Sequence, residues 1–166
     1  MMSSGGDERA RLANVLDREL GTIGTQAVLL SQVVADRLGL HARDVEVLDI
    51  LSRGGARTAG ELAELSGLTT GALTRLIDRL ERAGYVRREP NPRDRRSVLV
   101  VPIGERLARD MDPLYAPLER DLTELYARYS EEELSLLADF FGRVNAAVRE
   151  HIARLRATAP DGSTDG

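Results

Sequence analysis

Cysteine and lysine are absent from this chain of 166 residues, and aromatic residues make up only 4% of it. The absence of cysteine excludes disulfides, cysteine-ligated zinc sites and thiol nucleophiles. The chain has two histidines, His41 and His151, which are far apart in the sequence and lack the spacing of a metalloprotease motif. No glycine-rich phosphate loop is present, and no pair of acids has an apolar sequence background that would raise a pKa. We therefore expect no metal, no cofactor and no enzymatic activity.

Long hydrophobic runs are also missing. No segment approaches the ~18 apolar residues that a membrane span needs, and the N-terminal MMSSGGDERA lacks the basic and apolar regions of a signal peptide. We expect a cytoplasmic protein with no membrane partner. Hydrophobic residues at 42% and charged residues at 30% are typical of a folded globular protein. Abundant Leu, Ala, Glu and Arg favour helices over sheets, so the predicted fold is mainly α.

Apolar residues recur at three- and four-residue steps near both ends of the chain, which predicts long amphipathic helices there. The first covers residues 9–38. The last begins after Ser130, with Glu133 at the capping-box position. A helical stretch at 104–129 is expected to be kinked at its two prolines. The small, polar ends of the chain, 1–8 and 158–166, are predicted to be disordered.

The middle of the chain predicts short helices with clear boundaries. A helix is expected from about Ala42 to Ser52, followed by a second, AGELAEL, with Thr58 as its N-cap and Glu61 as the capping-box partner. Gly67 then provides a tight turn, because glycine adopts positive φ at little cost. A third helix, GALTRLIDRLERA, is capped by Thr69 or Thr70. This arrangement is typical of a helix-turn-helix.

Two further features favour a nucleic-acid partner over two ordinary surface helices. The third helix directs Leu73 and Leu76 inward and leaves Thr and Arg side chains, which reach phosphates and base edges, on its outer face. It is followed by YVRRE, a turn-rich loop and RRSVLVV, which together predict a β-hairpin with a basic tip. The segment from residue 53 to residue 96 contains ten arginines and six acids, so its net charge is +4, whereas the rest of the chain has a net charge of −8. Helix-turn-helix and hairpin together predict a winged helix.

The segment TAGELAELSGLTTGALTRLIDRLERAGYVRREPNPRDRRSVLV resembles the DNA-binding core of the MarR (multiple antibiotic resistance regulator) family of bacterial transcription factors. The strongest marks are Thr74-Arg75-x-x-Asp78-Arg79-Leu80-Glu81-x-x-Gly84 and the wing tip Asp94-Arg95-Arg96. Including the flanking helices, the resemblance covers roughly residues 10–156. It departs from the family at Val101-Pro102, where a Thr usually precedes the next helix. The lack of cysteine removes the thiol-sensing branch of the family.

The resemblance implies a homodimer that binds double-stranded DNA at a palindromic site and represses transcription until a small ligand releases it. Residues 42–102 would form the winged helix-turn-helix, and 9–38 with 104–157 the dimerisation region. Asp94 would pair with Arg96 and hold the wing, while Arg95 or Arg96 enters the minor groove. The candidate DNA contacts are Thr58, Thr69, Thr70, Thr74, Arg75, Arg79, Arg93, Arg95 and Arg96.

The same resemblance brings His41, Arg43 and Tyr115 into consideration as contacts for a small aromatic or anionic effector. The alternatives are that His41 only begins a helix and that Tyr115 is ordinary core. The dimer also has an independent basis, because apolar stripes at both chain ends exceed what a winged helix of ~90 residues needs for its own core. A helical bundle within one chain is the alternative.

A winged helix that binds acidic protein partners is the main rival to a DNA-binding regulator. Such a module would use its wing arginines on protein and would bind DNA weakly and without specificity. The arginines on both the third helix and the wing favour DNA.

Overall fold

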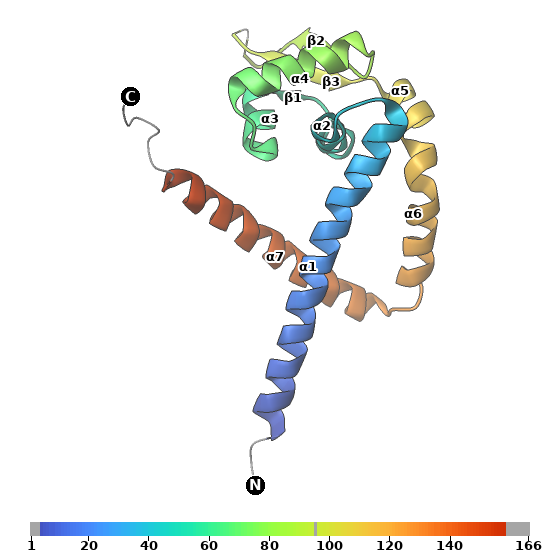
Figure 1. Ribbon diagram of the computed structural model, residues 1–166, viewed down its shortest axis with the longest axis vertical. Coiled ribbons are helices and arrows are strands. Elements are labelled where there is room, and N and C mark those ends of the chain that lie inside the picture. Colours follow the sequence, from blue (N-terminus) through green and yellow to red (C-terminus); the bar gives the residue numbers. More distant parts are fainter. Residues whose placement is uncertain (1–3, 95, 159–166) are drawn as a thin grey trace. The chain divides into compact units, whose positions relative to one another are not determined.

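The computed structural model describes residues 4–94 and 96–158 and is mainly helical (Figure 1). The chain divides into two compact units, residues 1–115 and 116–166. In chain order the elements are α1 (Ser4–Leu38), α2 (Ala42–Gly54), β1 (Arg57–Thr58), α3 (Ala59–Ser66), α4 (Thr70–Arg82), β2 (Val86–Pro90), β3 (Val98–Pro102), α5 (Gly104–Asp110), α6 (Asp112–Tyr126) and α7 (Glu131–Ala157). The predicted α class and hairpin are confirmed.

The first helix is longer than predicted. It begins at Ser4, so residues 4–8 are helical where a disordered terminus was expected. Asp7 lies in its first turn, where negative charge interacts favourably with the helix dipole, and Arg11 pairs with Glu8 at 2.6 Å. These local interactions extend the helix beyond its amphipathic part. The other positions predicted to be disordered, 1–3 and 159–166, lie outside the described residues.

The three strands form one antiparallel sheet in the order β1-β3-β2. Strands β2 and β3 are the predicted hairpin, with Arg88 opposite Val100. Strand β1 was not predicted, because two residues carry no periodic signal; it pairs Arg57 with Val100 and Thr58 with Leu99. The sheet thereby ties the start of α3 to the wing.

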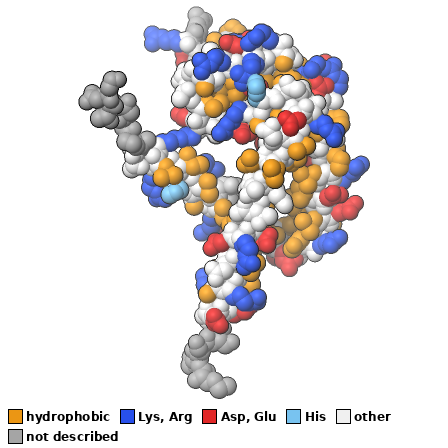
Figure 2. Space-filling model, viewed as in Figure 1, with side chains coloured by type: hydrophobic (Ala, Val, Ile, Leu, Met, Phe, Trp, Pro, Cys, Tyr) orange, Lys and Arg blue, Asp and Glu red, His pale blue; other side chains and the backbone are white. Residues whose placement is uncertain are grey.

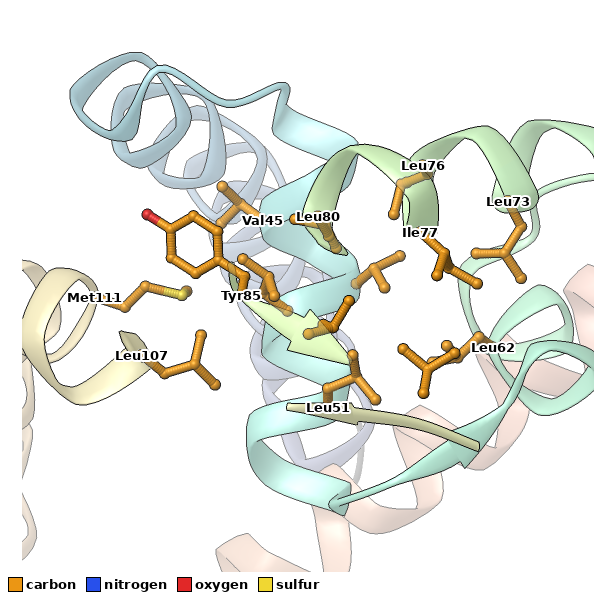
Figure 3. Close-up of a cluster of buried hydrophobic side chains, with 14 of the residues drawn as sticks. Val45, Leu51, Leu62, Leu73, Leu76, Ile77, Leu80, Tyr85, Leu107 and Met111 are labelled. Atoms are coloured by element: carbon orange, nitrogen blue, oxygen red, sulfur yellow. The ribbon is translucent and has the colours of Figure 1, made fainter. Parts of the chain in front are cut away.

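A single hydrophobic core fills the unit that contains the sheet (Figure 3). Helix α4 contributes apolar residues at helical spacing, and α2 contributes side chains that are completely buried, such as Leu48 and Leu51. Tyr85, Leu107 and Met111 extend the core toward α5. The buried members are Val34, Ala35, Val45, Val47, Leu48, Leu51, Leu62, Leu73, Leu76, Ile77, Leu80, Tyr85, Val86, Val100, Leu107 and Met111.

The predicted kinked stretch at 104–129 is two helices. Helix α5 ends at Asp110 and α6 begins at Asp112, with Met111 buried at the break. Pro113 lies in the first turn of α6, where its missing N–H costs nothing, and Pro117 lies inside the helix. Neither α6 nor α7 buries any residue. Helix α7 is capped by Ser130, whose side chain accepts a hydrogen bond from the Glu133 N–H, as predicted.

Candidate nucleic-acid interface

Helices α3 and α4 form a helix-turn-helix whose ends are set by side-chain caps. The Thr58 hydroxyl accepts from the Glu61 N–H at 3.3 Å, and the Glu61 carboxylate accepts from the Thr58 N–H at 2.7 Å. The hydrogen bond from the Thr58 N–H also lowers the pKa of Glu61, because it stabilises the ionised carboxylate. Gly67 ends α3 at φ 72°, the left-handed conformation expected of it. Thr69 is the N-cap of α4.

Helix α4 has two chemically distinct faces. Leu73, Leu76, Ile77 and Leu80 are buried against the core. The opposite face exposes Thr70, Thr74 and Arg75, all three predicted to contact DNA. The Thr74 hydroxyl donates to the Thr70 carbonyl at 2.9 Å and keeps its oxygen lone pairs available as acceptors. This outer face therefore offers hydroxyl groups and one guanidinium to a partner.

The arginines of the basic segment fall into two groups. Most have their guanidinium bound to groups of the same chain. The ion pairs are Arg53 with Asp49, Arg79 with Asp44, Arg87 with Glu89, and Arg88 with Asp78 and Glu81. Arg82 donates to the Asp78 carbonyl and Arg57 to the Ala56 carbonyl.

Three arginines of the segment remain available. Arg75, Arg93 and Arg96 are exposed and form no ion pair within the described part of the chain. Arg75 lies on α4, and the other two lie in the loop between β2 and β3. In Figure 2, arginine side chains gather over the surface that α4 and the wing strands form. Arg95, a further predicted contact, lies outside the described residues.

Arg79 differs from the other predicted DNA contacts. Its Nη2 lies 2.6 Å from Oδ1 of Asp44, a carboxylate that is 1% exposed. The same carboxylate accepts from the His41 N–H at the start of α2. A buried carboxylate requires a partner of opposite charge, and Arg79 supplies it. The guanidinium is therefore held by Asp44, although 38% of the Arg79 side chain remains exposed. The helical spacing of Arg79 on α4 carries no information about this partner, 35 positions away.

The wing loop is ordered by short hydrogen bonds. The Asn91 side chain donates to the Ser97 hydroxyl at 2.8 Å, and the Ser97 N–H donates to the Asp94 carbonyl at 3.0 Å. The Asp94 carboxylate accepts from the backbone N–H of Arg96 at 3.0 Å. This bond holds the loop through the main chain and leaves the Arg96 guanidinium available.

The three residues considered for effector binding are only partly brought together. Arg43 and Tyr115 line a cleft of about 450 Å³ beside α1, α2 and α3, whereas His41 is not among its lining residues. Burial raises the pKa of Tyr115, so its hydroxyl stays protonated. Arg43 is paired with Glu46 at 2.6 Å. The charge of its guanidinium is therefore balanced by the Glu46 carboxylate.

Within residues 4–94 and 96–158, no group of three or more His, Asp or Glu side chains is arranged to hold a metal ion. Among the helices of that same part of the chain, none is both long and apolar enough to cross a membrane.

Helices α2, α3 and α4 with the β2–β3 wing define a winged helix-turn-helix, the class of DNA-binding domain that inserts one helix into the major groove. The model of the MarR family matches residues 40–98. YcgE, an uncharacterized HTH-type transcriptional regulator of Bacillus subtilis (strain 168), is 40% identical over 150 residues, 90% of this chain and 97% of that protein. The chain belongs to the MarR family of transcriptional regulators, which are DNA-binding proteins and not enzymes.

Solved structures agree with this assignment. Wild-type MarR from Escherichia coli in its apo form matches with a TM-score of 0.55 at 28% identity, covering 78% of this chain and 95% of that one. A mutant of the same protein in complex with operator DNA matches with a TM-score of 0.50 at 29% identity, covering 78% and 92%.

Proposed function

We propose that this protein is a homodimeric repressor that binds a pseudo-palindromic operator and is released from it by a small molecule. The observation that carries the proposal is the set of exposed arginines without an ion pair. Arg75 on α4 and Arg93 and Arg96 on the wing lie on the two elements that meet DNA in a winged helix. With the hydroxyls of Thr70 and Thr74 they supply donors for base edges and phosphates.

A second copy of the chain would cover the apolar faces of the long helices. Helix α1 exposes Leu12, Leu16 and Ile23 at helical spacing, and α7 exposes Phe141 and Ile152. Hydrophobic side chains are visible at the surface along α1 and α7 (Figure 2). Exposed apolar stripes of this extent are typical of an oligomer interface. Two-fold symmetry would then place the two α4 helices ~34–36 Å apart, one turn of DNA, which predicts a pseudo-palindromic site.

The cleft beside α2 supports release by an effector. It is lined by apolar Leu30 and Ile50, by Tyr115 and by Arg43. An aromatic ring would pack against the apolar side chains, and an anionic group would compete with Glu46 for Arg43. Because α2 also supplies Asp44, the partner of Arg79 on α4, a shift of α2 on binding would reach the DNA-binding helix.

The experiment that tests this function is a fluorescence-anisotropy titration at near-physiological salt. The duplex from upstream of the protein's own gene is compared with a scrambled duplex. We expect binding to the native duplex to be ~10³-fold tighter. Equal and weak binding to both duplexes, followed by failure to select any sequence from a random duplex pool, would contradict the proposal and favour a winged helix that binds protein.

Arg75 provides the sharper test of base reading. Arg75→Ala should cost ~1–3 kcal/mol of binding free energy on the operator and little on scrambled DNA. Arg82→Ala is the matched control, since it removes the same charge from the same helix but its guanidinium donates to the helix's own backbone. An equal loss on both duplexes for Arg75→Ala would reassign that residue to a phosphate contact.

A further inference from the structure

In the segment Asp78-Arg79-Leu80-Glu81 of α4, every charged side chain is in an ion pair. The partners of these side chains lie outside α4, on α2 and on β2. Arg79 pairs with Asp44 of α2, and Asp78 and Glu81 both pair with Arg88 of β2. We call these residues, Asp44, Asp78, Arg79, Glu81 and Arg88, the α4 brace.

Arg88 makes the contacts that join α4 to the wing. Its Nη2 lies 2.6 Å from Oδ1 of Asp78, and its Nη1 contacts the Glu81 carboxylate. Its backbone N–H also donates to Glu81 Oε1 at 3.1 Å. The guanidinium thus bridges two carboxylates one turn apart on the helix, a geometry that its planar fork satisfies and a single ammonium does not.

Arg79 makes the corresponding contact on the other side of the helix. Its Nη2 and Nε lie 2.6 and 3.4 Å from the two oxygens of Asp44. Asp44 is almost completely buried in the first turn of α2. Arg79 therefore binds α2, whereas Asp78 and Glu81, on either side of it in the sequence, bind the wing strand β2.

We infer that the α4 brace positions the recognition helix relative to the wing, and that Arg88 is a positioning residue that does not contact DNA. The inference rests on the proposed function, since it concerns how α4 and the wing contact one operator at the same time. Helix α4 and the wing loop meet the same duplex only if their separation matches the two grooves. Losing the bridge would let them bind DNA separately, which lowers affinity for the correct site more than for random DNA.

The α4 brace also changes how Asp78 and Glu81 affect the affinity for DNA. Unpaired, Asp78 and Glu81 would repel phosphates from the DNA-binding face. Paired with Arg88, they act as acceptors within the protein. Simple charge counting predicts that removing both acids strengthens binding to every duplex in proportion. The brace predicts that scrambled DNA gains affinity, while the operator loses the benefit of correct positioning.

The test begins with a duplex that the wild-type protein selects from a random pool, compared with a scrambled duplex over a range of salt. For Arg88→Ala, the ratio of the two affinities should fall about tenfold, in the range of coupling between contacting residues. The slope of log affinity against log salt should stay unchanged. Arg93→Ala and Arg96→Ala should each reduce that slope by ~0.9, the loss of one phosphate contact.

Two further variants make the result specific to the bridge. Arg87→Ala is the matched control, because Arg87 is the preceding residue of β2 but its guanidinium pairs with Glu89 of the same strand. Its affinity ratio should stay at the wild-type value. Asp78→Asn combined with Glu81→Gln should lower the ratio while raising affinity for scrambled DNA. Arg88→Lys, which keeps the charge without the fork, should recover only part of the ratio.

The outcomes separate this inference from the proposed function. A wild-type protein that selects no duplex would overturn the function and the role of the brace with it. A specific wild-type protein whose Arg88→Ala variant keeps its affinity ratio would overturn only the brace. A salt slope lowered by ~0.9 in that variant would instead make Arg88 a phosphate contact. If Arg88→Ala fails to fold by circular dichroism, the Asp78→Asn/Glu81→Gln protein decides, and a proportional gain on both duplexes counts against the brace.

Discussion

The winged helix and the C-terminal helices differ in where their apolar side chains lie. Helices α2 and α4 direct theirs into one core, whereas α6 and α7 bury none. Leu48 on α2 is 0% exposed and Leu136 on α7 is 69% exposed. Both have the same side chain in an amphipathic helix, so local pattern alone does not separate them. The winged helix is therefore stabilised by its own core, whereas the apolar side chains of α6 and α7 would be covered only by the second copy of the chain that we propose.

The core of the winged helix should be the part of the molecule most sensitive to substitution. Leu48→Ala deletes a completely buried side chain, and because interiors relax only partially around a cavity, it should cost about 2–5 kcal/mol of the free energy of unfolding. Chemical denaturation at fixed protein concentration measures this loss.

Leu136→Ala is the matched control for that measurement. It removes the same atoms from an exposed position, so it should change the intrinsic stability by no more than about 0.5 kcal/mol. A loss comparable to that of Leu48→Ala, persisting at concentrations where the chain is monomeric, would mean that α7 packs into a core of its own chain.

The second prediction concerns the surface that α7 presents. Phe141→Glu places a charge in the middle of its apolar stripe, and burying that charge without a partner in a dimer is unfavourable. The dimer dissociation constant should rise by about 100-fold or more, measured by sedimentation velocity. Ala146→Glu adds the same charge to α7 at an exposed position on the opposite face of the helix, and it should leave the constant nearly unchanged.

If both variants sediment like the wild type, the homodimer through α7 is contradicted. If both weaken association equally, the interface is governed by net charge and not by the apolar stripe. The comparison between Phe141 and Ala146 therefore separates hydrophobic burial from electrostatic repulsion on one helix.

Much of the fold follows from local signals. Helix caps at Thr58 and Ser130 were identified from a hydroxyl followed three residues later by Glu, a pattern whose hydrogen bonds involve only neighbours. The hairpin was identified from β-branched residues on both sides of a turn-rich loop. Strand β1 was missed because it exists only through its pairing with β3, at the far end of the winged helix.

The allocation of the arginines was the least predictable part of the site. The sequence shows ten arginines between residues 53 and 96 and a net positive charge there, but it does not show that several of them are in ion pairs. Asp44 lies in the first turn of α2, where the helix dipole favours an acid, and it is also the buried partner of Arg79. The contact spans 35 positions and depends on how α2 packs against α4. A signal was present in the Asp78-Arg79-Leu80-Glu81 run, whose alternating charges suit partners on two sides of the helix.

The unit that contains the sheet should also lose some stability in acid, a smaller effect than the two above. Asp110, at the end of α5 beside the core, accepts a hydrogen bond from the Arg109 guanidinium, which lowers the pKa of its carboxyl; the Tyr85 hydroxyl and Arg106 lower it further, against the opposing effect of desolvation. The folded state thus keeps Asp110 ionised to a lower pH than the unfolded chain does, where the pKa is about 3.9. Stability is fully present above that value and is lost as pH falls through the folded pKa.

Asp110→Asn should therefore flatten the dependence of the thermal midpoint on pH between about 5 and 2, because the substituted side chain takes up no proton. Differential scanning calorimetry at constant protein concentration measures it, so that dissociation does not contribute. Asp121→Asn, at an exposed position of α6, is the control and should leave the wild-type slope. Equal flattening by both would mean that the two regions share the acid sensitivity, which would remove the distinction between them.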